Sequence, residues 1–217
     1  GRSAAPPMRG VEADAPATSS PSSSPPPTSP PPTTTTLTNV KLRLASFDRI
    51  AEFDAATGTH RVVAESKGTV FYGMFPGTDA ARDVVVSTRP GTSLFPDRAE
   101  AKTAPADALM EFDATTGALR RSVPLSTRFT HDAVRRGNEV FVADTRRGAV
   151  QVMSGPPELQ ETARLELFSG TDHLNTIAPI ESRAVWVVLH NRNAPSRAAL
   201  VDPTTSRIVT EWSGIGD

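Results

Sequence analysis

The sequence predicts an all-β fold, a β-propeller, that follows a disordered N-terminal segment rich in Pro, Ser and Thr. From Leu37 onward the chain consists of short apolar runs, mostly of five to seven residues, separated by Gly, Asp, Asn and Pro. These runs are rich in Val, Phe, Leu and Ile, which favours strands. We find no convincing helix of ten or more residues; the nearest candidate, 98–111, is interrupted by Pro105.

A repeated hairpin is the strongest pattern in the sequence. It occurs as RIAEFDAATGTHRVV (49–63), ALMEFDATTGALRRSV (108–123) and AALVDPTTSRIVTEW (198–212). In each copy an Asp, which is Asp54, Asp113 or Asp202, follows a strand and precedes small residues that end in Thr-Gly or Thr-Ser. The Asp side chain is expected to accept hydrogen bonds from the turn backbone, and Gly allows a positive φ. We interpret residues 149–167 as a degenerate copy of this hairpin.

The spacing of these hairpins divides the chain into units. Units of about 40–45 residues with four short strands are typical of propeller blades. We therefore expect a partial blade at 37–66 and blades at 67–125, 128–168 and 173–213. Because about four blades is the lower limit for ring closure, we expect these to be part of a six- or seven-bladed ring. A β-sandwich is the alternative architecture, but it does not explain the matching hairpins.

Residues 1–36 form a separate compositional block, whose centre is the Pro/Ser/Thr tract from Ala17 to Thr36. With almost no large apolar side chains, this block gains too little from burial to offset the entropy of ordering. We expect a disordered linker. An O-glycosylated stalk, which would favour an extracellular or cell-surface location, and a ligand for SH3-like domains are the alternatives.

Composition excludes several function classes. The formal net charge of −1 does not indicate a nucleic-acid partner, and no apolar run reaches the length of a membrane span. With no Cys, a disulfide framework and a thiolate site are excluded. The chain also lacks the G-x-S-x-G, phosphate-loop, dinucleotide-binding and H-E-x-x-H motifs. Trp186 and Trp212 lie in predicted strands and are expected in the core.

Polar residues recur where two predicted blades begin. His131 and Asp132 open one blade, and Asp172, His173 and Asn175 open the next. In a propeller the first strand of each blade lines the central channel, so these side chains are expected to converge. They could bind a ligand, or they could hold neighbouring blades together through hydrogen bonds.

The FDATTG-type hairpins and the His-Asp and His-x-Asn sequences at blade starts resemble the broad six-bladed propeller superfamily. That group includes the NHL repeats and the strictosidine synthase-like, gluconolactonase-like and paraoxonase-like proteins. The resemblance covers 37–217. It implies the fold but not one function, because this fold hosts both enzymes and binding scaffolds.

Three functions follow as expectations, the last of them a purely structural extracellular module whose stalk links it to a wall or matrix. The first is a binding scaffold that presents loops on one propeller face to a protein or small-molecule ligand and needs no cofactor. The second is implied by the paraoxonase- and gluconolactonase-like resemblance: a calcium-dependent hydrolase of the lactonase or arylesterase kind. There His131 would act as the catalytic base, and Asn175 and Asp132 would be Ca²⁺ ligands.

Overall fold

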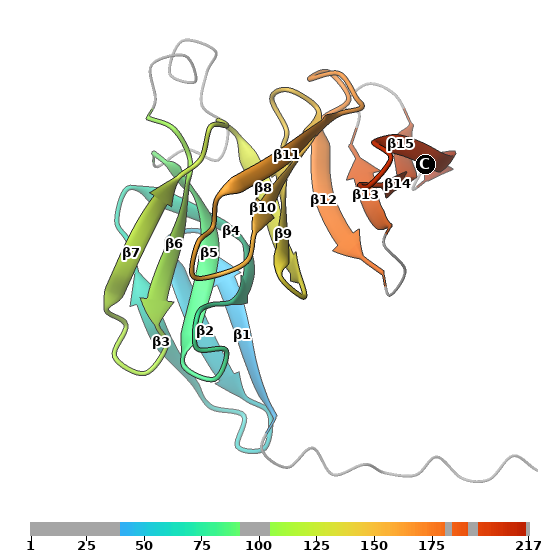
Figure 1. The fold of residues 1–217 in the computed structure, drawn as a ribbon. Helices are drawn as coiled ribbons and strands as arrows, with labels where there is room; N and C mark the ends of the chain where they lie inside the picture. Colours follow the sequence, from blue (N-terminus) through green and yellow to red (C-terminus); the bar gives the residue numbers. More distant parts are fainter. Residues whose placement is uncertain (1–39, 92–104, 181–183, 191–194, 216–217) are drawn as a thin grey trace, which may run out of the picture. The chain divides into compact units, whose positions relative to one another are not determined.

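The computed structural model describes residues 40–91, 105–180, 184–190 and 195–215, all within one compact unit, Leu37–Asp217. The N-terminal segment 1–36 and residues 98–104 of the candidate helix 98–111 lie outside the described residues, and residues 108–111 of that candidate belong to a strand. The described residues contain strands and no helix (Figure 1). The predicted all-β fold class is therefore confirmed.

The strands form four antiparallel sheets, numbered one to four in chain order. Sheet one contains β1 (Lys41–Ser46), β2 (Arg49–Asp54) and β3 (His60–Glu65). Sheet two contains β4 (Thr69–Pro76), β5 (Asp83–Pro90), β6 (Ala108–Asp113) and β7 (Leu119–Pro124). Sheet three contains β8 (Thr130–Arg136), β9 (Glu139–Asp144), β10 (Ala149–Ser154) and β11 (Glu161–Glu166). Sheet four contains β12 (Leu174–Pro179), β13 (Val185–Leu189), β14 (Ser196–Asp202) and β15 (Arg207–Ile215). Consecutive strands pair throughout, so each sheet is an up-and-down meander of the kind that makes a propeller blade.

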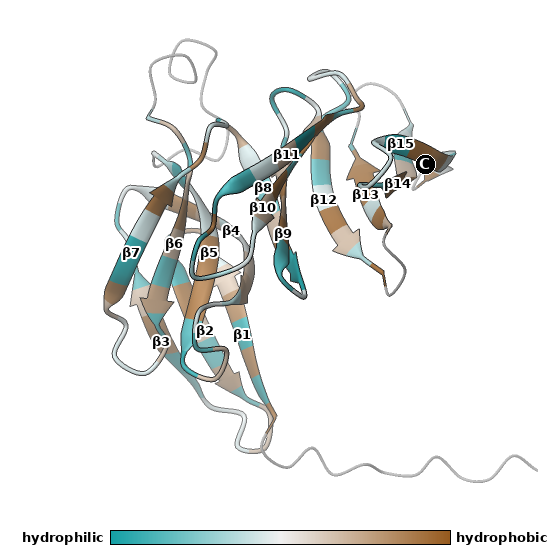
Figure 2. Cartoon of the chain, in the orientation of Figure 1, coloured by the Kyte–Doolittle hydropathy of each residue, from teal (hydrophilic) through white to brown (hydrophobic). Residues whose placement is uncertain are grey.

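Apolar side chains fill the spaces between successive sheets. One core cluster joins sheets one and two around Ile50, Phe71 and Phe112. A second joins sheets two and three, and a third joins sheets three and four around Phe141 and Leu174. The strands in Figure 2 carry bands of both colours, as expected for strands whose side chains alternate between a core and another surface. Each sheet is thus held by its neighbours in sequence.

Hairpin turns contain the three predicted Asp residues. The Oδ1 atom of Asp54 accepts hydrogen bonds from the amides of Ala56 and Thr57, at 2.9 and 3.2 Å. Asp113 accepts the equivalent bonds from Thr115 and Thr116 at 2.8 and 3.1 Å, and Asp202 accepts one from Thr204 at 2.8 Å. Gly58 and Gly117 take the positive φ in the first two turns, and Ser206 takes it in the third.

Sheet three contains a fourth Asp turn, in the hairpin before the predicted degenerate copy at 149–167. In sheet three the Asp turn joins β9 to β10, where the Asp144 Oδ1 accepts from the Arg147 amide at 3.2 Å and Gly148 has a φ of 68°. The predicted copy at 149–167 is also a hairpin, but residues 155–160 connect its strands. This connection is longer and contains Pro156 and Pro157, so it cannot form the short Asp turn.

The two tryptophans lie together on sheet four. The ring centroids of Trp186, in β13, and Trp212, in β15, are 4.7 Å apart. Trp212 is 45% exposed, so the prediction that it lies in the core is wrong. The side chains of Val185, Val187 and Leu189 fill the core against sheet three, and Trp186 points to the opposite face because it alternates with them.

The first strands of sheets two, three and four are neighbours. β8 contacts both β4 and β12. At Gly73 of β4, an added Cβ would overlap the backbone nitrogen of Ala133 and the side chain of Asp132 in β8. Only glycine permits this close approach. The strand starts are therefore brought together in space although they are far apart in sequence.

Candidate binding site at the strand starts

His131 and Asn175 form the centre of the candidate site. They occupy the second positions of β8 and β12, and His131 Nδ1 lies 2.8 Å from Asn175 Oδ1. Because an amide oxygen can only accept, Nδ1 of His131 donates, and a neutral His131 then has its lone pair on Nε2. The ring of His173 lies edge-on to His131 with centroids 4.8 Å apart, and His190 lies 6.2 Å from His173. Three of the predicted residues, His131, His173 and Asn175, are thus brought together.

Two aromatic rings flank His131 and were not predicted. Tyr72 of β4 stacks on His131 with centroids 5.2 Å apart and planes 9° from parallel. Phe129, just before β8, lies at 6.4 Å. The Tyr72 ring is half-buried, and burial raises the pKa of its hydroxyl above the usual value. The sequence did contain a signal for these two rings, because Phe129 is two residues before His131 and Tyr72 lies in the first strand of the preceding unit.

A buried charged pair supports these rings. The guanidinium carbon of Arg89 lies 4.6 Å from the Phe129 centroid and 5.4 Å from that of Tyr72, and Arg89 is only 3% exposed. Asp107 is also buried and accepts a hydrogen bond from the Thr130 amide. Burial raises the pKa of Asp107 to about 6, although the Thr130 hydrogen bonds and the nearby Arg89 charge oppose this. Cation–π contacts with Arg89 hold the rings of Phe129 and Tyr72 in place.

The predicted residues Asp132 and Asp172 make different contacts. The Asp132 Oδ2 accepts a hydrogen bond from the Ile177 amide at 2.9 Å, and so links β8 to β12. Burial raises the pKa of Asp132 above its usual value, partly offset by hydrogen bonds from Ile177 and Ala133. Asp172 forms an ion pair with Arg197 of β14 at 2.6 Å and accepts from the Ser169 amide at 2.8 Å. These contacts favour structural roles for both carboxylates.

Asn175 and Asp132, the two predicted calcium ligands, carry at most three side-chain oxygens between them. Ca²⁺ takes about six to eight oxygen ligands. Asn175 Oδ1 accepts from His131, and Asp132 Oδ2 accepts from the Ile177 amide. Across the residues that the structure describes, no group of three or more His, Cys, Asp and Glu side chains is arranged to hold a metal. Calcium binding by Asn175 and Asp132 therefore stays a prediction of the resemblance.

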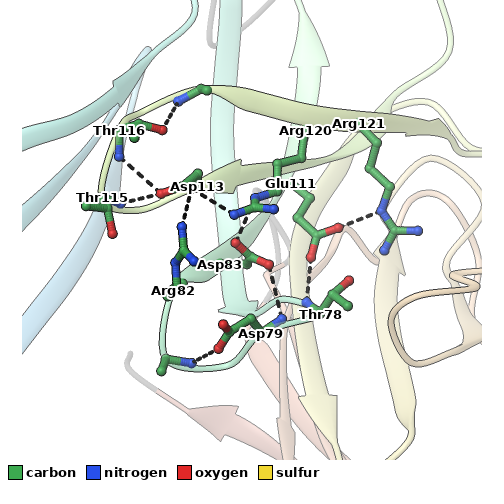
Figure 3. A network of polar contacts seen from close by, with 12 residues as sticks. Thr78, Asp79, Arg82, Asp83, Glu111, Asp113, Thr115, Thr116, Arg120 and Arg121 are labelled. Atoms are coloured by element: carbon green, nitrogen blue, oxygen red, sulfur yellow. Dashed lines mark hydrogen bonds and ion pairs between the residues drawn. The ribbon is translucent and has the colours of Figure 1, made fainter.

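A second group of charged side chains lies on sheet two and its turns (Figure 3). Arg120 pairs with Asp83 at 2.9 Å and with Asp113 at 2.7 Å. Glu111 pairs with Arg121 at 2.6 Å and accepts from the Thr78 amide at 2.5 Å. These carboxylates form ion pairs with arginines and accept hydrogen bonds from turn amides of the same sheet. The group therefore connects β5, β6 and β7, and it is not a candidate site.

Comparison with solved structures identifies the fold. A structure titled as a mitotic checkpoint complex has a TM-score of 0.55 at 10% identity over 78% of this chain and 47% of that one. The Pan2 WD40 domain of Neurospora crassa has a TM-score of 0.53 at 8% identity over 76% of this chain and 46% of that one. A nidogen/laminin complex has a TM-score of 0.54 at 12% identity over 79% and 61%. The fold is that of a β-propeller.

These similarities show the fold alone, since all three identities are far below 25%. This chain spans about half the length of the first two structures that it matches. No family model and no curated protein matches the sequence. In the ranges that the structure describes, no helix could span a membrane.

Proposed function

We propose that the protein is a binding scaffold that takes a protein segment at the starts of β4, β8 and β12. The observation that carries this proposal is the set of half-buried rings of Tyr72, Phe129, His131 and His173, held next to the amide of Asn175. Aromatic rings on a rigid frame give large contact area at low entropic cost, and polar groups between them orient a ligand.

The surrounding contacts support a preorganised site. Arg89 makes cation–π contacts with the rings of Tyr72 and Phe129. The Asp132–Ile177 hydrogen bond fixes β8 relative to β12. A rigid site loses little conformational entropy on binding. Two of the similar structures are titled as protein complexes, which is consistent with use of this fold in assembly. No observation favours the calcium-dependent hydrolase, which stays an expectation of the resemblance.

A peptide selection tests the proposal. Peptides from a random displayed library would be selected on the 217-residue chain and their affinity compared with that for the double variant His131→Ala/His173→Ala. If the rings form the binding surface, the selected peptides lose about tenfold or more in affinity for the double variant, as expected when central aromatic contacts are truncated.

The matched control is His60→Ala, which removes an exposed imidazole from the start of β3. Circular dichroism of each variant shows whether the sheets are intact. Peptides that bind the double variant and the wild type equally, with both folded, would place the binding surface elsewhere and defeat the proposal.

A further inference from the structure

One edge of β1 has no partner strand in the part of the chain that the structure describes. Sheet one has the order β1-β2-β3, so β1 pairs with β2 on one side only (Figure 1). The other three sheets each have four strands. The position of β1 in the repeat therefore decides which strand an addition at this edge would supply.

The strand equivalent to β1 in sheet two is β5, the second strand. The first two copies of the repeated hairpin form β2–β3 and β6–β7. Arg61 of β3 donates a hydrogen bond to the Ala114 carbonyl of the next sheet, as Arg121 of β7 donates to the Pro157 carbonyl. β1 also contacts β4, as β5 contacts β8. The open edge of β1 therefore lies where sheet two has its first strand.

Backbone groups along this edge are directed outward. The Val40 carbonyl accepts a hydrogen bond from the Ala55 amide at 2.9 Å, and this pair continues the register of β1 and β2. In an antiparallel pair, alternate residues direct their amide and carbonyl groups toward the partner strand, and the residues between them direct these groups away. The backbone groups of Lys41, Arg43 and Ala45 therefore point to the open edge, where another strand can bond to them.

Side chains on one face of β1 carry an excess of positive charge. Lys41, Arg43 and Arg61 all contact the Glu52 carboxylate, at 3.6, 3.2 and 3.0 Å. None of these three cations forms an ion pair with another carboxylate of the described residues, so they exceed their shared partner by two charges. Arg43 also lies 3.5 Å from the Ala81 carbonyl, which is neutral.

A cavity of about 240 Å³ lies between these cations and sheet two. It is lined by residues of β1, β4 and β5, namely Lys41, Arg43, Met74, Phe75, Pro76 and Val84. Because β4 contacts β8 and β8 contacts β12, a first strand added to sheet one would lie against β4 in the same way. An acidic side chain of that strand would place its apolar stem against Met74 and Phe75 and its carboxylate at the two cations.

The opposite face of β1 is apolar. Leu42 and Leu44 alternate with the two cations and are 49% and 57% exposed. Directly opposite side chains of adjacent strands pack against each other. Apolar residues of an added strand would therefore cover these two leucines.

We propose that the open edge of β1 binds an extended segment of a protein partner in which acidic and apolar residues alternate. The segment adds an antiparallel first strand to sheet one. Its carboxylates pair with Lys41 and Arg43, and its apolar side chains cover Leu42 and Leu44. In strand addition the main-chain hydrogen bonds give affinity and the alternate side chains give specificity. This edge shares no residue with the strand-start site, and neither proposal depends on the other.

The test is a titration of the isotopically labelled 217-residue chain, followed by backbone amide chemical shifts. The probe is the capped peptide Thr-Glu-Val-Glu-Val-Glu-Thr. We expect saturable shifts at 41–45 in β1 and at 74–76 in β4. The same peptide with Lys in place of Glu should not bind. A peptide with N-methyl groups on the Glu amides keeps the charges but lacks the strand hydrogen bonds, and it should also fail to bind.

Two variants and one control identify the cations. Lys41→Gln and Arg43→Gln should each weaken binding of the Glu peptide roughly threefold or more, since each removes one ion pair. Lys67→Gln removes the same charge from the exposed β3–β4 connection and should leave the affinity unchanged. Arg61 stays on Glu52 in both variants of β1, so the ion pairing within sheet one is retained.

Four results would overturn the proposal. They are the absence of saturable shifts at 41–45, equal binding of the Lys or the N-methylated peptide, and equal affinities of Lys41→Gln and Lys67→Gln for the Glu peptide. The fourth is a shift of the β1 amides that depends on protein concentration without any peptide, because a second copy of the chain would then occupy the edge.

Discussion

At the residue scale, the buried residues Arg89 and Asp107 support the proposed binding surface. Arg89 contacts the rings of Tyr72 and Phe129. Asp107 accepts a hydrogen bond from the backbone amide of Thr130, the residue before His131. A buried carboxylate is costly in its charged form, and the nearby guanidinium offsets only part of that cost. Asp107 should therefore reduce the stability of the protein at neutral pH.

This cost gives a pH-dependent prediction for Asp107→Asn. The folded-state pKa of about 6 lies above the value of about 3.9 expected in the unfolded chain. The folded state therefore binds more protons between these pH values, and Asp107 makes stability fall as the pH rises from about 4 to about 6. The amide oxygen of the substituted side chain can still accept from Thr130 without carrying a charge. The variant should gain roughly 2 kcal/mol at pH 7 and lose this slope.

Urea unfolding at several pH values from 4 to 7 measures both effects. Glu158→Gln is the control, because Glu158 is an exposed carboxylate in the β10–β11 connection. The prediction would be contradicted if the unfolding free energy of Asp107→Asn differed from that of the wild type by the same amount at pH 4 and at pH 7.

At the element scale, the hairpin turns look alike in sequence but differ in their surroundings. Gly58 and Gly117 occupy the same place in two copies and have φ values of 70° and 75°. A Cβ at Gly58 would meet no atom within 4 Å, whereas one at Gly117 would overlap the carbonyl oxygen of Val63 in sheet one. The second turn therefore also packs against the neighbouring sheet.

The matched variants Gly58→Ala and Gly117→Ala separate these two roles. Both place an alanine at positive φ, which costs about 1–2 kcal/mol. Gly117→Ala must also move the β3 backbone, so its loss of unfolding free energy should be at least about twice that of Gly58→Ala. Denaturant midpoints at an unchanged m-value provide the comparison. Equal losses would mean that the turn does not hold sheets one and two together.

The element scale also shows what sequence patterns can predict. The alternation of apolar residues and the Asp turns predicted the strands, because side-chain period and turn chemistry are local properties. The degenerate copy at 149–167 is the hairpin of the last two strands of sheet three, as the copies at Asp113 and Asp202 are in sheets two and four. The Asp turn at Asp144 was not among the predicted copies. The exposure of Trp212 was missed because alternation does not identify which face of a sheet is covered.

At the scale of the whole molecule, the candidate site at the strand starts is assembled from sheets two, three and four. His131, His173 and Asn175 could be predicted to converge because they recur at blade starts, one unit apart. Arg89 and Asp107 do not recur in this way: Arg89 comes from a second strand and Asp107 from the segment before β6. Their proximity to Phe129 depends on how sheets two and three pack, which a single sequence does not reveal.

A thermal melt of the whole chain separates the scaffold from the calcium-dependent hydrolase. Asp132 and Asn175 already accept hydrogen bonds within the protein. We therefore expect excess EDTA, and then restored Ca²⁺, to leave the melting temperature unchanged. A drop of several degrees that Ca²⁺ reverses would show that a bound metal stabilises the native state, and would favour the hydrolase.

The pairing of Trp186 with Trp212 has a consequence for spectroscopy. The chain has two tryptophans, and both lie on sheet four. The tryptophan fluorescence of this chain is therefore a local signal, emitted from sheet four, whose core side chains pack against sheet three. Circular dichroism reports all the sheets at once. When the two signals are followed through one unfolding transition, any difference between them measures how far sheet four separates from the others before the rest unfolds.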